Sequence, residues 1–240
     1  MKAKHVSVGI IGYGSFGSFL ARKLDKRVNV KVFSPNNDVP KSWTASFDQV
    51  AMCDYVIPAI PLSAYEEVLL KLQKITPETT IIVDICSIKE RPIELIQKYL
   101  PGNPLIATHP LFGPESAEKS LKGFPIILCE ESHDAPLELV KIFLGSLGLD
   151  CKIMTAAEHD HLMAKLQSLT FFLARALERI GVKDLPIMTP SYMKLVSLAD
   201  LEQHHSDELF KTIQAGNKFA KPMREQLLNE LNALHKEITE

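Results

Sequence analysis

Residues Val6–Leu24 read VSVGIIGYGSFGSFLARKL, and three glycines in this segment join a short apolar run to an amphipathic run. The pattern predicts a strand, a tight turn and a helix. Gly12 suits the sharp turn, Gly14 lets the backbone approach a phosphate, and Gly17 lets the helix pack closely on the strand. A single G-x-G-x-x-G is weak evidence by itself, but its position between a strand and a helix indicates a dinucleotide pyrophosphate site. The alternative is a glycine turn that serves packing alone.

The composition is that of an ordinary globular protein, with 46% hydrophobic and 23% charged residues among 240. This length allows one large domain or two modest ones. The net charge of −2, without a basic run, favours neither a nucleic acid nor a membrane surface as a partner. The spacing of the four cysteines is neither that of a zinc site nor that of a C-x-x-C motif, so we expect free thiols and a cytoplasmic location.

Strand patterns alternate with helix patterns over the first part of the chain. We expect strands near residues 28–33, 53–60, 80–85, 105–108, 124–128 and 151–154. Such alternation predicts an α/β fold with a doubly wound parallel sheet over residues 1–153. Strand signals stop after Met154, and we expect a small all-α domain over residues 154–240. An apolar stripe near the end of that domain consists of Leu227, Leu231, Leu234 and Ile238.

Two local signals bear on where the elements begin and end. Three Ser/Thr-x-x-Glu segments, which start at Ser63, Ser87 and Thr155, have the capping-box form and predict helix starts. Pro58 lacks the N–H that a central strand needs, so we expect it near the end of its strand.

The end of the second expected strand bears on the choice of cofactor. Ser34 stands where an acidic residue would accept a hydrogen bond from the ribose 2′-hydroxyl and favour NAD. The first carboxylate, Asp38, comes too late in the chain for this role. Without the acid a 2′-phosphate is not repelled, which favours NADP slightly over NAD. The expected cofactor-binding residues are Gly12, Gly14, Ser15, Phe16, Gly17, Ser34, Ile60 and Pro61.

Two polar residues follow expected strands at the edge where an open parallel sheet binds its ligands. His109 can accept a proton while a substrate alcohol is oxidised, although a histidine here can equally satisfy loop backbone. Ser87 can orient a substrate hydroxyl, but its spacing from Glu90 also suits a helix N-cap.

Several motifs together carry a family resemblance. The pattern Asp84-x-x-Ser87-x-Lys89, the run HPLFGPE at residues 109–115, and Glu158-His159-Asp160 with Gln167 resemble the prephenate and arogenate dehydrogenases of tyrosine biosynthesis. The His-Pro-x-Phe-Gly-Pro form is similar to the plant and enteric branches. The resemblance implies a Rossmann domain, then a helical domain that forms a homodimer, with the active site in the cleft between them.

The resemblance also implies a reaction. Hydride leaves ring C4 of arogenate or prephenate for the nicotinamide of NADP or NAD, and loss of CO2 makes the ring aromatic. His109 would accept the hydroxyl proton, and Ser87 would hydrogen-bond the same hydroxyl. Both residues are therefore expected to be catalytic.

Substrate contacts are expected from the helical domain. Gln167 and Asp160 share one helix face, and Lys194 and Lys211 occupy the region where the family often has an arginine. Arg175 is a further candidate for binding the substrate carboxylates. Asp207, or its neighbour Glu208, would favour the ammonium group of arogenate.

Two other functions compete with this interpretation. A β-hydroxyacid dehydrogenase places an asparagine or aspartate four residues after its catalytic lysine, but here Leu169 follows Lys165 at that spacing. A dinucleotide-sensing module would need the glycine turn but neither Ser87 nor His109. The histidines at 159, 161, 204 and 205 lack a third kind of well-spaced ligand, so we expect no metal.

Overall fold

The structure is a computed structural model that describes residues 6–36, 38–201 and 206–239. The chain divides into two compact units, Met1–Ala156 and Ala157–Glu240. We describe each unit by itself. In the described residues every helix is too short or too polar to cross a bilayer.

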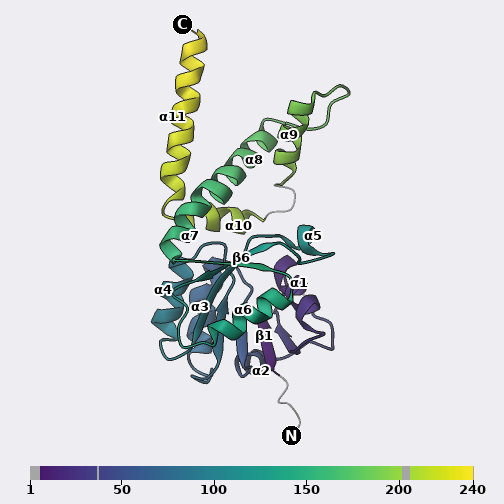
Figure 1. Ribbon diagram of the computed structural model, residues 1–240, viewed down its shortest axis with the longest axis vertical. Coiled ribbons are helices and arrows are strands. Elements are labelled where there is room, and N and C mark those ends of the chain that lie inside the picture. Colours follow the sequence, from purple (N-terminus) through teal and green to yellow (C-terminus); the bar gives the residue numbers. More distant parts are fainter. Residues whose placement is uncertain (1–5, 37, 202–205, 240) are drawn as a thin grey trace. The chain divides into compact units, whose positions relative to one another are not determined.

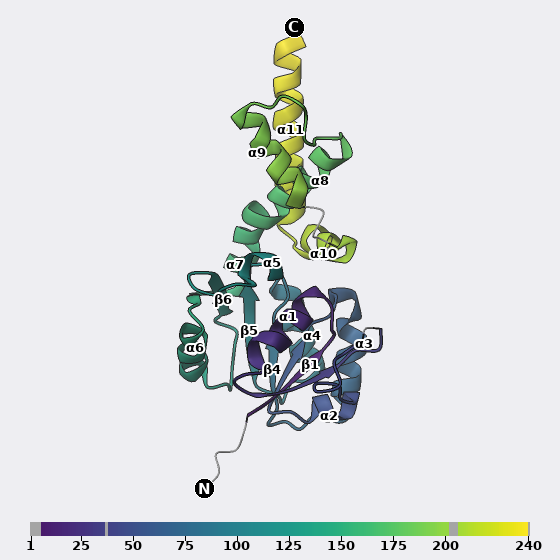
Figure 2. The same ribbon diagram turned by 90° about the vertical axis from the view of Figure 1, so that its right-hand side faces the viewer.

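The first unit is built around a seven-stranded sheet with the strand order β2-β1-β3-β4-β5-β6-β7 (Figures 1 and 2). The strands are β1 (Ser7–Ile11), β2 (Asn29–Phe33), β3 (Tyr55–Pro58), β4 (Ile81–Asp84), β5 (Leu105–Pro110), β6 (Pro125–Cys129) and β7 (Asp150–Met154). The predicted α/β class with a doubly wound sheet is confirmed. Pro58 is the last residue of β3, as its missing N–H requires.

The sheet is parallel from β2 to β5, but β6 pairs antiparallel with β5, and β7 runs parallel to β6. The expectation of a parallel sheet therefore holds for five strands and not for the last two. A parallel pair needs a crossover, usually a helix that spans the sheet. The connection from β5 to β6 contains only the four-residue helix α5 (Pro114–Ala117), so the chain returns antiparallel.

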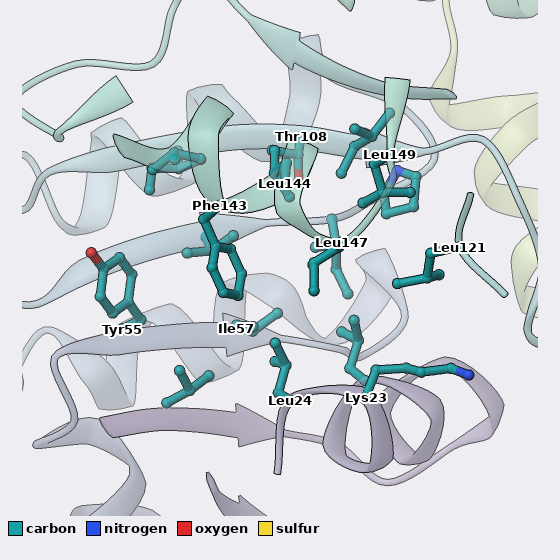
Figure 3. A pocket seen from close by; sticks show the side chains of 18 of the residues that line it. Lys23, Leu24, Tyr55, Ile57, Thr108, Leu121, Phe143, Leu144, Leu147 and Leu149 are labelled. Carbon is teal, nitrogen blue, oxygen red and sulfur yellow. The ribbon is translucent and has the colours of Figure 1, made fainter. Parts of the chain in front are cut away.

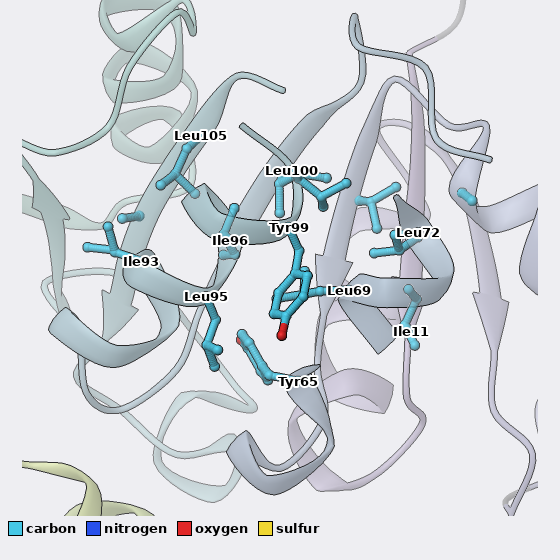
Figure 4. Packing of buried hydrophobic residues seen from close by; sticks show 14 of the residues in the cluster. Ile11, Tyr65, Leu69, Leu72, Ile93, Leu95, Ile96, Tyr99, Leu100 and Leu105 are labelled. Carbon is cyan, nitrogen blue, oxygen red and sulfur yellow. The ribbon is translucent and has the colours of Figure 1, made fainter. Parts of the chain in front are cut away.

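Helices cover both faces of the sheet. One face packs against α2 (Phe47–Ala51), α3 (Tyr65–Leu72) and α4 (Glu90–Tyr99), and the other packs against α1 (Ser15–Leu24) and α6 (Leu137–Ser146). Figure 4 shows the first of these cores, where Tyr65 and Leu69 of α3 meet Tyr99 of α4. Two separate apolar cores thus hold the sheet rigid between its helices.

Two predicted helix starts are wrong. A 3-10 turn, η1 (Leu62–Ala64), precedes α3, and Ala64 rather than Ser63 is the N-cap residue. Lys89 rather than Ser87 is the N-cap residue of α4, and the helix has no side-chain cap. A complete capping box is present at Ser46 and Gln49, before α2. The helix α7 begins at Ala156, directly after Thr155, as predicted.

The second unit is helical in its described residues. Its elements are α7 (Ala156–Met163), the π-helical segment η2 (Ala164–Ser168), α8 (Leu169–Arg179), α9 (Pro190–Ala199), α10 (Asp207–Lys211), the π-helical segment η4 (Thr212–Gly216) and α11 (Ala220–Thr239). The helices α8 and α9 lie side by side, and α11 packs against η2, η4 and α8. Most of α11 is exposed.

Candidate active site

The glycine turn lies between β1 and α1. Gly12 has φ +104°, and a Cβ atom there would lie 2.3 Å from the carbonyl oxygen of Ala59. A Cβ on Gly17 would lie 2.4 Å from the carbonyl oxygen of Gly12. In contrast, a Cβ on Gly14 would have no protein atom within 4 Å. Packing therefore explains two of the glycines, while the third leaves the backbone open to an outside group.

The amino end of α1 is free to receive an anion. Gly14 is its N-cap residue, the helix has no side-chain cap, and both Gly14 and Ser15 are exposed. The ring of Phe16 is 6.3 Å from the ring of Phe112, so this side chain belongs to an aromatic cluster. Exposed N–H groups at a helix start favour a phosphate, and the turn thus fits a dinucleotide pyrophosphate.

Other predicted cofactor residues lie around the same turn. The Gly12 N–H donates to the carbonyl oxygen of Phe33 over 2.8 Å, which brings the next residue, Ser34, close to the turn. Ile60 follows β3, and its Cγ2 atom would be 3.0 Å from a Cβ on Gly12. Pro61 comes next in the chain and is exposed. The structure thus gathers the ends of β1, β2 and β3 at one edge of the sheet.

Ser87 and His109 belong to the same edge. Asp84 pairs with Ala107 in the parallel register of β4 and β5, so Ser87, three residues after Asp84, and His109, two residues after Ala107, follow neighbouring positions of the sheet. His109 lies in β5, is 3% exposed and pairs with Ile127 of β6. Ser87 is half-buried in the loop before α4, and it is not the helix cap. The loss of the capping role removes the competing explanation for Ser87.

A buried ionic network lies beside these two residues. Lys89 and Asp84 form an ion pair with both side chains 0% exposed, and the Tyr65 hydroxyl donates to Asp84 Oδ1 over 2.8 Å. Burial and the nearby Asp84 carboxylate hold the pKa of Tyr65 well above its usual value. Burial, with the same carboxylate, raises the pKa of the Cys86 thiol to about 12. The sequence did not predict this network, although the D-x-x-S-x-K spacing of Asp84, Ser87 and Lys89 contains both of its charged residues.

An apolar cavity of about 340 Å³ lies on the opposite side of β5. Figure 3 shows Leu24, Ile57 and Phe143 on its wall, from α1, β3 and α6. Thr108 and Pro110 also line it. Side chains alternate along a strand, so His109 points away from this cavity. With an almost wholly apolar wall, the cavity does not suit a dicarboxylate substrate.

In the helical unit, Gln167 and Asp160 have different surroundings. Gln167 lies in η2, and its amide oxygen is buried without a hydrogen-bond partner among the described residues. Asp160 is 1% exposed; its Oδ1 is 2.8 Å from His159 Nδ1, and its carbonyl oxygen accepts from Asn217. The amide oxygen of Gln167 can thus accept from a group outside the described residues, whereas Asp160 is already bonded within the unit.

The predicted charged contacts do not form one cluster. Asp207 Oδ1 accepts from Arg175 over 2.8 Å, and the Arg175 guanidinium lies 4.3 Å from the centre of the Phe210 ring. Lys194 is exposed on α9, and Lys211 is exposed on α10 with its ammonium 3.7 Å from Glu208. The described part of the chain contains no group of three or more metal-ligating residues, and residues 204 and 205 lie outside it.

Two family models match the chain. The model described as "Prephenate dehydrogenase, nucleotide-binding domain" matches residues 25–152, which include Ser87 and His109. A second, described as "TYRAAT1-like, C-terminal domain", matches residues 176–240. Together the two matches cover most of both units.

Curated relatives and solved structures agree with these matches. "Arogenate dehydrogenase 2, chloroplastic" from Arabidopsis thaliana is 29% identical, over 99% of this chain and 71% of that protein. "Probable arogenate/prephenate dehydrogenase" from Methanocaldococcus jannaschii is 28% identical, over 100% of this chain and 57% of that protein. The crystal structure of A. aeolicus prephenate dehydrogenase with hydroxyphenyl propionate and NAD+ has a TM-score of 0.76 at 20% identity, over 100% of this chain and 92% of that one. The structural similarity supports the fold.

Proposed function

Because this chain belongs to the prephenate dehydrogenase family, we propose that it oxidatively decarboxylates arogenate or prephenate with a nicotinamide cofactor. The observation that carries the proposal is the placement of Ser87 and His109 at neighbouring strand ends, at the edge that also carries the glycine turn. Ligands of open α/β sheets bind at this edge.

His109 acts as the base in this proposal. It accepts the proton of the ring 4-hydroxyl, and Ser87 hydrogen-bonds the same oxygen. A bound nicotinamide cofactor would supply the acceptor for the hydride that leaves C4. The C4–H electron pair leaves with the hydride, a C4 carbonyl forms, and release of CO2 from C1 returns an electron pair that makes the ring aromatic. General-base help of this kind is worth about 10²–10⁴ in rate.

The glycine turn and the start of α1 hold the cofactor pyrophosphate. Gly12, Gly14 and Gly17 shape the turn, and the N–H groups of Ser15 and Phe16 face the anion. Ser34 would contact the adenosine ribose of the cofactor, and Ile60 and Pro61 would line the same site. The position of Ser34 favours NADP, since its hydroxyl does not repel a 2′-phosphate as a carboxylate would.

The helical unit contributes to substrate binding. The unpaired amide oxygen of Gln167 suits a hydrogen-bond donor on the ligand, such as an ammonium or hydroxyl group. Lys194 and Lys211 are the assigned partners of the substrate carboxylates, and Asp160 orients the helix that carries Gln167. Asp207 favours arogenate, although its pairing with Arg175 offsets part of its charge.

The family resemblance and the exposed stripe on α11 support a homodimer formed by residues 154–240, with residues 1–153 as the nucleotide-binding domain. Leu231 is 48%, Leu234 53% and Ile238 83% exposed, at the spacing of a helix seam. The four cysteines are free, which suits the reducing cytoplasm.

One steady-state experiment tests the activity. Arogenate and prephenate are each combined with NADP and with NAD, and the formation of reduced cofactor is followed by its absorbance. We expect turnover with at least one pair, and a fall in kcat of about 10²–10⁴ in His109→Asn with cofactor affinity kept. Cofactor binding without turnover would instead identify a dinucleotide sensor. Normal turnover in His109→Asn would remove this residue from the mechanism.

A further inference from the structure

The pairing of β3 and β4 stops before either strand ends. The register contains only Tyr55 with Ile81 and Val56 with Ile82, while β3 continues to Pro58 and β4 to Asp84. The register ends at these pairs, and Pro58 at the end of β3 has no N–H to continue it. A different set of groups must therefore fix their carboxyl ends, and these are the ends that border the active site.

Tyr65 is one of the groups that join the carboxyl ends of β3 and β4. Its hydroxyl donates to Asp84 Oδ1 over 2.8 Å and lies 3.3 Å from the carbonyl oxygen of Pro58. The same carboxylate oxygen accepts a hydrogen bond from the Cys86 N–H over 3.0 Å, at the start of the loop that leads to Ser87. Asp84 thus links the end of β3 to the start of the Ser87 loop.

Lys89 extends the linkage to β5. Its ammonium contacts the second oxygen of Asp84 and donates to the carbonyl oxygen of Thr108 over 2.5 Å. The Thr108 hydroxyl donates in turn to the backbone carbonyl of Asp84 over 2.8 Å. The carbonyl of Thr108 belongs to the peptide bond that enters His109. The buried ammonium of Lys89 therefore binds the backbone carbonyl of Thr108, the residue before His109.

Net stability does not readily account for such a pair. Removing two charges from water costs about as much as their attraction returns, and a neutral apolar pair of similar size is often as stable. This pair is fully excluded from water, bonds directly to β5 and is linked through Tyr65 to β3, so it can fix the relative positions of three strand ends. Errors of about 1 Å in a reacting group can reduce rates about a hundredfold.

We propose that Lys89, through its buried ion pair with Asp84, is a positioning residue that fixes the Thr108–His109 peptide relative to the Ser87 loop. This inference rests on the proposed function, because it assumes that His109 is the base. The linkage acts on the backbone of the base, so it should affect the chemical step and leave cofactor binding at the glycine turn unchanged.

The decisive variant is the double substitution Asp84→Asn with Lys89→Met. It removes both charges together, leaves no unpaired ion, and keeps an acceptor for Tyr65. We expect a melting temperature close to that of the wild type, a fall in kcat of about 10- to 100-fold, and a cofactor Kd within about twofold. Lys71→Met, which removes the exposed Lys71–Glu67 pair on α3, is the matched control and should change none of these values.

A second readout separates this inference from the proposed activity. The imidazole signals of His109 in ¹H–¹⁵N NMR spectra, identified by their loss in His109→Asn, should shift or broaden in the double variant but not in Lys71→Met. A folded double variant with wild-type kcat and unchanged His109 signals would overturn the positioning role. Absence of turnover in the wild type would count against the proposed function only, and the NMR comparison would still decide the positioning role. If the double variant does not fold, Lys89→Arg is judged by the same two readouts.

Discussion

A Cβ atom on Gly17 would lie 2.4 Å from the carbonyl oxygen of Gly12, so α1 begins in direct backbone contact with the end of β1. Side chains cannot enter such a contact without moving the backbone. We expect Gly17→Ala to lower the free energy of unfolding by about 1–3 kcal/mol, which thermal denaturation measures. The contact explains why the turn and the helix act as one rigid element.

Gly14→Ala provides the opposite case in the same turn. Its Cβ would meet no protein atom within 4 Å, and its φ of −74° suits any residue. We therefore expect an unchanged melting temperature but a cofactor Kd raised about tenfold or more, equivalent to about 1.4 kcal/mol. Fluorescence titration with reduced cofactor measures this. Wild-type affinity in Gly14→Ala would place the pyrophosphate elsewhere.

The sequence predicted the elements that depend on local pattern. The strand, turn and helix of residues 6–24 follow from periodicity and glycine spacing, and Pro58 marks a strand end because it has no N–H. The direction of β6 and β7 was not predictable in this way. It depends on whether the connection after β5 crosses the sheet, which hydrophobic pattern does not encode.

Part of the candidate site was also accessible from sequence, and part was not. His109 and Ser87 were identified as strand-end residues, and the register of β4 and β5 brings them to one edge. The prediction that Ser87 caps the helix was wrong, because Lys89 is the N-cap residue of α4. The side chain of Lys89 is buried. Lysine is almost always exposed, so a buried Lys89 is visible only in the structure.

Ser34→Asp should change the cofactor preference. Ser34 follows β2 next to the glycine turn, and a carboxylate there would repel a 2′-phosphate and accept from a 2′-hydroxyl. We expect the ratio of kcat/KM for NADP to that for NAD to fall at least about tenfold, or 1.4 kcal/mol. Asn36→Asp, exposed two residues later, is the control and should leave the ratio nearly unchanged. Equal ratios in both variants would show that the ribose does not reach Ser34.

Leu231→Glu tests the proposed homodimer and should disrupt it. Leu231 is exposed in the middle of the α11 stripe, where a buried carboxylate without a partner would oppose helix pairing. Light scattering should then give the mass of one chain instead of two. Asn229→Glu changes a residue off the stripe on the same helix and should keep the dimer. A wild-type chain that is already monomeric would contradict the assigned interface.

Val140→Ile should stabilise the first unit. Val140 lines the apolar cavity beneath α6, so an added methyl group enters unfilled space. Burial of one such group is worth about 0.8 kcal/mol, which urea denaturation resolves as a higher midpoint. Val56→Ile is the control: Val56 is 0% exposed in the packed core on the other face, and the extra group should cost about 1–3 kcal/mol there. Equal effects would mean that the cavity is closed in solution.

Cys86 should make stability depend on alkaline pH. Burial, and then the Asp84 charge, raise the pKa of its thiol from 9.0 to about 12, so the folded state keeps the proton longer than the unfolded state. The contribution of this thiol is fully present below pH 9.0 and is lost as pH rises towards about 12. We expect the unfolding free energy to fall over this interval, and to fall less steeply in Cys86→Ala. Tyr65 contributes to the same slope, because its pKa is also raised by burial, so a residual slope should remain in the variant. An identical slope in Cys86→Ala would mean that water reaches the thiol, and that the loop beside Asp84 opens in solution.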